Sequence, residues 1–220
     1  MTSSEGRIPE IYLLGSGGHA KVVRDCLIVC GNDVAGYLQP DKSSEDPFAT
    51  LAYIGGDDKL AELDPESSRL VNGIGSIPGN SDLRRSVFKF GLEQGHTFHN
   101  IIHPSAIISD VVFAQGLQIM AGAVLQPGTR VGQNVIINTR ASVDHDCVVG
   151  DHVHIAPGAV LSGNVRIGAD THIGTGAIVI QGVDIGSNCV VGAGAVVTQD
   201  VPNGAIVYPA RSSIKEGNDS

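Results

Sequence analysis

Apolar residues recur at every sixth position through the second half of the chain. Counted in steps of six from Ile101 to Val197, no position is polar. Two residues before most of these positions stands a small or β-branched residue, such as Ala123 or Thr129. A period of six fits neither an amphipathic helix nor an isolated alternating strand. It predicts a hexapeptide solenoid, in which three short strands and three turns complete a triangular coil of about 18 residues.

We expect this solenoid to be a left-handed parallel β-helix over residues 101–207, with roughly five coils, followed by a C-terminal tail over 208–220. Identical positions stack from coil to coil, so aliphatic side chains fill the narrow interior. The chain contains 29 glycines, which together with asparagines supply left-handed backbone conformations at the corners.

Residues 1–100 follow a different pattern. The segment EIYLLGSGGHAKVVRDCLIVCG (10–31) predicts a strand, a glycine turn and a helix. The apolar residues of this helix that recur at helical spacing are Val22, Val23, Leu27 and Ile28. Two further strands are predicted at 33–38 and 69–76, and a second helix at 80–95. Alternating strands and helices predict a small Rossmann-like α/β domain with a parallel sheet.

Composition and charge exclude several classes of partner. Of the 220 residues, 42% are hydrophobic and 17% charged, as in globular proteins. The net charge of −9 and the lack of a lysine or arginine run argue against nucleic-acid binding. Residues 1–10 hold no apolar signal segment, and no apolar run could span a bilayer, so we expect no membrane insertion. The four cysteines form no CxxC pair, which predicts a reduced, cytoplasmic protein.

The glycine turn GSGGHA (15–20) fits the loose G-x-G-x-x-G/A pattern between a strand and a helix. Backbone N–H groups at such a helix start suit a phosphate, although a simple tight turn has the same pattern. The second strand ends in Gln39 instead of the acid that binds the ribose of NAD, with Asp41 two residues later. We therefore expect a mononucleotide or a nucleotide sugar here. His19 would lie at the mouth of the site or, alternatively, in solvent.

Four histidines in the solenoid allow three interpretations: a metal site, a general base, or polar surface residues. The spacings between His145, His152, His154 and His172 are 7, 2 and 18. None equals the spacing of five found between two zinc ligands of the gamma-class carbonic anhydrases, so we expect no metal. His152 is expected to be a surface residue, and His172 a surface residue or part of a groove wall.

His145 stands between two carboxylates, Asp144 and Asp146. An adjacent carboxylate orients one ring nitrogen and raises the basicity of the other, which suits proton removal from an amine or hydroxyl nucleophile. Cys147 and Cys189 fall on the small-residue ladder and are expected to be core residues.

Four motifs carry a resemblance to a known family over nearly the whole chain. They are YLLGSGGHAKVV near the start, HPSA at 103–106, INTRASVDHDCVVGDHVHIAPGAVLSGNVRIG at 137–168, and VGAGAVVTQDVP ending at Pro202. The sequence resembles the hexapeptide-repeat sugar acetyltransferases, the group of sialic acid O-acetyltransferases and of bacillosamine and perosamine N-acetyltransferases. Two departures from the family pattern are Gln39–Pro40 and the tail Val207–Arg211, which lacks the usual glycine.

The resemblance implies an acetyl-CoA-dependent N-acetyltransferase that acts on a nucleotide-linked amino sugar in surface glycan synthesis, without a metal. It implies His145 as general base and Asp146 as its supporting acid. It also implies a homotrimer with active sites at the subunit interfaces. The positions implied for acetyl-CoA are His154, Thr175 and Ala193, and those for the nucleotide sugar are Gly17, Gly18, His19, Asp41 and Gly75. Sialic acid O-acetylation and a non-catalytic scaffold remain the alternatives.

Overall fold

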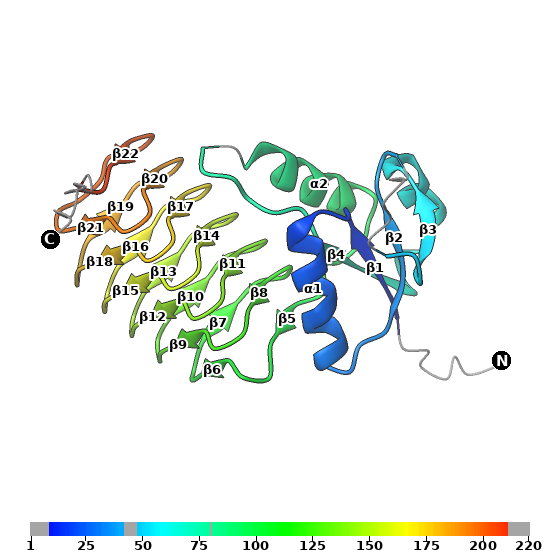
Figure 1. Cartoon of the computed structure of the whole chain (residues 1–220), viewed down its shortest axis with the longest axis horizontal. Helices are drawn as coiled ribbons and strands as arrows, with labels where there is room; N and C mark the ends of the chain where they lie inside the picture. Colours follow the sequence, from blue (N-terminus) through cyan, green and yellow to red (C-terminus); the bar gives the residue numbers. More distant parts are fainter. Residues whose placement is uncertain (1–8, 42–47, 80, 211–220) are drawn as a thin grey trace, which may run out of the picture.

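The computed structural model describes residues 9–41, 48–79 and 81–210. It places an α/β domain against the first coils of a long β-helix (Figure 1). No helix in these ranges is long and apolar enough to cross a membrane.

The α/β domain contains a four-stranded parallel sheet with the order β3-β2-β1-β4. Its strands are β1 (Glu10–Leu14), β2 (Val34–Leu38), β3 (Ala52–Gly55) and β4 (Ser68–Asn72). Helix α1 (Gly18–Val29) packs on one side through the cluster that includes Leu13, and α2 (Asp82–Glu93) packs on the other through the cluster that includes Leu14. A 3₁₀ helix (Asp57–Glu62) follows β3.

Two features of this domain differ from the sequence prediction. Strand β3 was missed because none of its residues is buried, which leaves only a weak apolar signal. In α1 the buried residues include Val23 and Leu27, whereas Val22 and Ile28 are exposed. Val22 and Ile28 are each one residue away from the buried pair, so they lie about 100° around the helix from it.

The β-helix has three faces, each a sheet of two-residue parallel strands. The first, which we call the covered face, consists of β5 (Ile101–Ile102), β8 (Gln118–Ile119), β11 (Ile136–Ile137), β14 (His154–Ile155), β17 (His172–Ile173), β20 (Val190–Val191) and β22 (Ile206–Val207). The second, the apolar face, consists of β6 (Ile107–Ile108), β9 (Val124–Leu125), β12 (Ser142–Val143), β15 (Val160–Leu161), β18 (Ile178–Val179) and β21 (Val196–Val197). The third, the charged face, consists of β7 (Val112–Phe113), β10 (Arg130–Val131), β13 (Val148–Val149), β16 (Arg166–Ile167) and β19 (Asp184–Ile185).

The predicted six-residue ladder fills the interior from Phe113 onward. Upstream the register is one residue off: Ile102 and Ile108, not Ile101 and Ile107, pair with the inner positions of the next coil. Ile107 is accordingly 64% exposed. The first coil is one residue shorter than the 18-residue coils that follow it, and a strict six-residue count cannot detect this.

The corners of the coils have the expected left-handed conformations. Glycines share these positions with Asn, Asp, Arg and His residues, among them Asn134 (φ 55°), Asp146 (φ 59°) and His152 (φ 61°). Asparagine and aspartate tolerate this region better than most residues with a side chain. The corner geometry therefore follows from the sequence.

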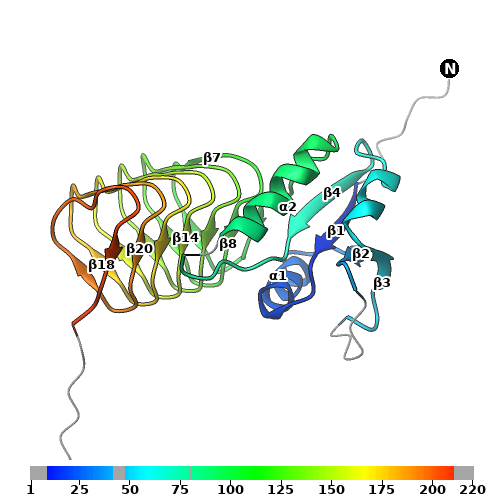
Figure 2. The same cartoon turned by 90° about the horizontal axis from the view of Figure 1, so that it is seen from above.

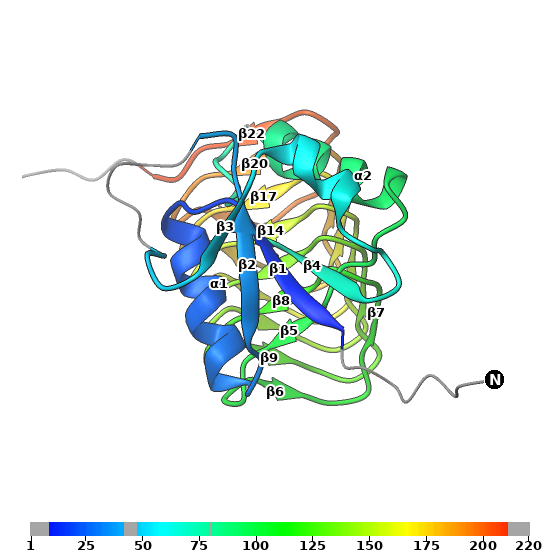
Figure 3. The same ribbon diagram turned by 90° about the vertical axis from the view of Figure 1, so that its right-hand side faces the viewer.

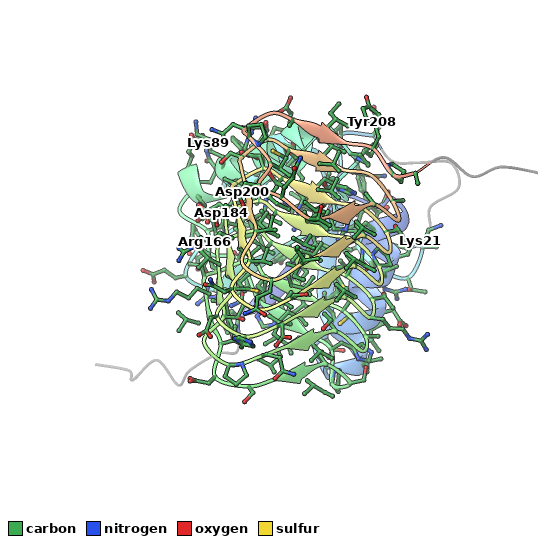
Figure 4. The ribbon with its side chains drawn as sticks, turned by 90° about the vertical axis from the view of Figure 1, so that its left-hand side faces the viewer. Lys21, Lys89, Arg166, Asp184, Asp200 and Tyr208 are labelled. Carbon is green, nitrogen blue, oxygen red and sulfur yellow. The ribbon has the colours of Figure 1, made fainter. Side chains whose placement is uncertain are left out.

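The three faces have different surroundings. The covered face lies next to the N-terminal domain, and its outward residues Gln118, Ile136, His154 and His172 are buried (Figures 2 and 3). Figure 4 shows Arg166 and Asp184 on the outside of the charged face, where the two side chains come within 3.7 Å.

Candidate active site

His145 and Asp146 lie in the corner between the apolar face and the charged face. Nδ1 of His145 hydrogen-bonds Oδ2 of Asp146 at 2.8 Å, and Oδ1 of Asp144 accepts the backbone N–H of His145 at 2.7 Å. The side chains of His145 and Asp146 are 51% and 66% exposed. This carboxylate fixes the proton on Nδ1 and leaves Nε2 as the acceptor. The hydrogen bond to Asp146 raises the pKa of His145 above 6.5, with smaller contributions from the negative charges of Asp144 and Asp146.

Two glycines provide space for this pair. Gly163 lies one coil after His145, and a Cβ there would clash with Nε2 of the imidazole. Gly128 lies one coil before Asp146, and a Cβ there would clash with its carboxylate. Gly163 does not adopt positive φ, so the lack of a side chain, not backbone strain, is what this position requires. Neither glycine was predicted, although a step of 18 residues from His145 leads directly to Gly163.

A second group of histidines lies between the N-terminal domain and the covered face. The rings of His154 and His172 meet edge to face at 4.8 Å, and Nε2 of His154 hydrogen-bonds the amide of Asn138 at 3.0 Å. Burial lowers the pKa of His154 to about 3, helped by the nearby His172, His19 and Arg84. Burial likewise lowers the pKa of His172 to about 4. These rings are neutral at physiological pH.

The predicted roles of His152 and His172 have different outcomes. His152 is half-buried: Nδ1 hydrogen-bonds Asn134, and the ring packs edge-on against Phe88 of α2 at 5.7 Å. The prediction of a surface residue was wrong, because α2 lies over this corner. His172 lines a cavity of about 230 Å³ beneath Ser76 and Ile77, in agreement with a groove wall.

The glycine turn of the α/β domain borders a cavity of about 360 Å³, which we call the glycine pocket. Its lining residues are Gly17, Gly18, His19, Gly73, Ile74, Gly75, Ser76, Ile77 and Leu83. His19 is not a solvated loop residue, since its Nε2 hydrogen-bonds Oε1 of Gln118 at 2.8 Å. Burial lowers its pKa to about 4, and Arg84 adds to this effect.

The remaining predicted substrate residue, Asp41, is exposed and is not among the residues that line the glycine pocket. Gln39, which stands where the family usually has an acid, accepts a hydrogen bond from the Ser16 hydroxyl in the glycine turn. Gln39 therefore closes the turn from inside the domain.

The residues expected to contact acetyl-CoA lie in the corner between the covered and apolar faces. Thr175 and Ala193 are exposed and occupy equivalent positions one coil apart, where Gly194 N–H donates to the Thr175 carbonyl at 2.8 Å. His154 lies on the covered face and reaches the same corner through Asn138. The apolar face separates this corner from His145. Within one chain, the predicted base and the predicted acetyl-CoA residues thus lie at opposite edges of one sheet.

Among the described residues, no group of three or more His, Cys, Asp or Glu side chains is arranged to hold a metal ion. All four cysteines are free thiols, and Cys147 and Cys189 are buried in the β-helix interior as expected.

Comparison with known proteins agrees with this architecture. The PglD N-terminal domain family matches residues 10–89, the bacterial transferase hexapeptide family matches 128–163, and the succinyl-transferase hexapeptide repeat matches 164–199. The acetyltransferase domain of PglB from Neisseria gonorrhoeae FA1090, solved with acetyl coenzyme A, is 36% identical with a TM-score of 0.81. The alignment covers 93% of this chain and 98% of that one. The chain belongs to the PglD-like hexapeptide acetyltransferases.

Other solved structures extend the comparison of this PglD-like acetyltransferase. PerB from Caulobacter crescentus, in complex with CoA and GDP-perosamine, is 37% identical with a TM-score of 0.82, over 90% of this chain and 93% of that one. WeeI from Acinetobacter baumannii AYE is 25% identical with a TM-score of 0.68, over 90% and 95% of the two chains. Membership of an acetyltransferase family rules out the non-catalytic scaffold.

Proposed function

We propose that this PglD-like acetyltransferase transfers the acetyl group of acetyl-CoA to the amino group of a nucleotide-linked amino sugar. The observation that carries the proposal is the His145–Asp146 pair, an exposed imidazole that a carboxylate orients through Nδ1. The acceptor nitrogen Nε2 is left available for a substrate proton. PglB and PerB, which are bound to acetyl coenzyme A and to CoA with GDP-perosamine in their structures, support the choice of both substrates.

The reaction proceeds by direct attack. The neutral sugar amine forms a bond to the thioester carbonyl carbon as His145 Nε2 accepts one amine proton. A backbone N–H stabilises the oxyanion of the tetrahedral intermediate. The carbon–sulfur bond then breaks, and the imidazolium returns its proton to the departing CoA thiolate. The carboxylate of Asp146 stabilises the imidazolium through its hydrogen bond to Nδ1.

The glycine pocket is the site that suits the nucleotide part of the substrate. It lies at the start of α1, where free N–H groups and the helix dipole favour a phosphate. There is open space around Gly17 and Gly18, which allows a ligand to approach the backbone closely.

The geometry favours a homotrimer as the active form. The glycine pocket adjoins the covered face through His19 and Gln118, whereas His145 lies at the far edge of the apolar face. A site that combines both therefore needs a neighbouring chain. The apolar face offers the contact surface, because its outward residues form a nearly apolar stripe made up of Ile107, Val124, Ser142, Val160, Ile178 and Val196. Ile178→Glu should convert the trimer into monomers in analytical ultracentrifugation.

The free cysteines are consistent with a cytoplasmic location.

A thiol-release assay with acetyl-CoA tests the proposal. The acceptors are UDP-, GDP- and dTDP-linked amino sugars on one side and sialic acids on the other. We expect thiol release with at least one nucleotide-linked amino sugar, and an N-acetyl product by mass spectrometry. Thiol release with sialic acids alone would show that the enzyme is an O-acetyltransferase and not an N-acetyltransferase. Thiol release with neither class of acceptor would contradict the proposal.

A further inference from the structure

Arg84 is a fully buried cation with no carboxylate partner in the part of the chain that the structure describes. Arg84 is 2% exposed, and its guanidinium forms no ion pair within the described part of the chain. The two acids near the start of α2, Asp82 and Asp170, both pair with the neighbouring Arg85, at 2.5 and 2.9 Å. Burying a guanidinium without a carboxylate is unfavourable, and burial lowers the pKa of Arg84 to about 9. The group nevertheless remains charged at neutral pH.

The hydrogen bonds of Arg84 go to backbone carbonyls directly behind the glycine pocket. One terminal nitrogen donates to the carbonyl of Ile74 at 2.6 Å and to that of Asn72 at 3.2 Å. The other donates to the carbonyl of Asn134 in the β-helix at 3.4 Å. Nε has no hydrogen-bond partner among the described residues. Arg84 therefore holds the loop that forms one wall of the pocket.

This arrangement orients a backbone donor of the pocket wall away from Arg84. The peptide between Ile74 and Gly75 is trans, so its N–H points opposite to its carbonyl. Because the carbonyl of Ile74 faces Arg84, the N–H of Gly75 faces away from it, and Gly75 lines the glycine pocket. The charge of Arg84 also reaches the pocket, since it contributes to the lowered pKa of His19, which lines the pocket next to Gly75.

We propose that Arg84 is a positioning residue for the diphosphate of the nucleotide sugar. It places an uncompensated positive charge behind the pocket wall and holds the Gly75 N–H toward the bound phosphates. A bound diphosphate supplies a counter-charge to Arg84, which forms no ion pair among the described residues. This inference rests on the proposed function, because it assumes that the glycine pocket holds a nucleotide.

Three substitutions separate charge from hydrogen bonding. Arg84→Lys keeps the charge and an N–H donor group, Arg84→Gln keeps a donor group for the Ile74 carbonyl without the charge, and Arg84→Met keeps neither. Arg85→Met is the matched control, because Arg85 is the adjacent arginine on α2 but is exposed and paired with Asp82 and Asp170. Each variant is first checked for acetyl-CoA binding, which should equal that of the wild type.

Titration calorimetry of the full chain with UDP, GDP and dTDP, and competition with the corresponding nucleosides, tests the inference. We expect Arg84→Gln and Arg84→Met to weaken the binding of the diphosphate by about ten- to a hundredfold, and Arg84→Lys to restore most of it. Nucleoside affinity should not change, and Arg85→Met should match the wild type. If Arg84→Met fails to fold, the diphosphate affinities of Arg84→Gln and Arg84→Lys test the inference by themselves.

Equal losses of affinity for the nucleoside and for the nucleoside diphosphate would show that Arg84 only supports the fold. An unchanged affinity of Arg84→Gln for the diphosphate would also overturn the inference. If the wild type itself binds none of the three diphosphates, the proposed nucleotide-sugar site is wrong, and the inference fails with it. The two failures are thereby distinguished.

Discussion

His145 and His154 are nine residues apart in the sequence, yet the fold gives them opposite chemical properties. His145 projects from a corner, and Asp146 raises its pKa. His154 lies on a face that the N-terminal domain covers, and burial lowers its pKa to about 3. One ring is therefore prepared to accept a proton, whereas the other stays neutral as part of a wall. Position on the triangular coil, not residue type, determines the role.

The contrast has a consequence for mutations. Among the described residues, the exposed ring of His145 hydrogen-bonds only Asp146, so its removal should leave the fold intact. His154 contacts His172 and Asn138 under the N-terminal domain, so its removal alters the contact between the two domains.

The largest effect is expected from His145→Ala. Loss of a general base should lower kcat/KM by about 10²–10⁴-fold, with a melting temperature close to that of the wild type. Steady-state thiol release and thermal unfolding measure the two quantities. Turnover within a few-fold of wild type would remove His145 from the mechanism.

Gly163→Ala should have the next largest effect. The new methyl group occupies the place of the His145 ring and displaces it from Asp146, which should lower kcat by about 10- to 100-fold. In a His145→Ala background the same substitution should change neither activity nor stability. A further loss in that background would mean that Gly163 acts independently of the imidazole.

Asp146→Asn should lower the plateau of kcat by about tenfold and move the acid limb of its pH profile. The carboxylate raises the pKa of His145, and the reaction needs the neutral ring, so activity falls as the pH drops through that raised pKa. Without the carboxylate the pKa returns toward 6.5, and the limb moves to lower pH. Asparagine tolerates the left-handed backbone at this position, so the fold should persist. A limb at unchanged pH would show that Asp146 does not control the titrating group.

The smallest effect concerns stability. His172 has a lowered pKa of about 4, so the unfolded chain takes up its proton first as the pH falls below 6.5. The native state therefore loses stability between pH 6.5 and about 4, by at most about 1.4 kcal/mol per pH unit for each such histidine. Urea unfolding at several pH values should show a shallower loss for His172→Gln. His145→Gln is the control and must not reduce the slope, because its pKa is shifted in the opposite direction.

Much of the architecture could be predicted from the sequence because a solenoid repeats its environment. The six-residue period predicted the inner ladder and the left-handed corners, and the adjacent carboxylate predicted the hydrogen bond between His145 and Asp146. A fixed six-residue step did not detect the short first coil, since nothing in the apolar pattern distinguishes Ile107 from Ile108. The burial of His152 and Arg84 depends on where α2 docks, which is a contact between distant segments. No local pattern encodes such a contact.

The most direct test of the central claim is complementation between two inactive chains. In the first variant, Gly17→Trp, the indole ring should fill the glycine pocket without disturbing the fold, because no atom beyond the adjacent residues lies within 4 Å of a Cβ at this position. The second variant, His145→Ala, lacks the proposed base. If the pocket of one chain works with the base of its neighbour, co-expression of the two variants in equal amounts should restore about a quarter of wild-type activity. Activity that stays at the level of the single variants would show that the pocket and the base do not work together across the subunit interface.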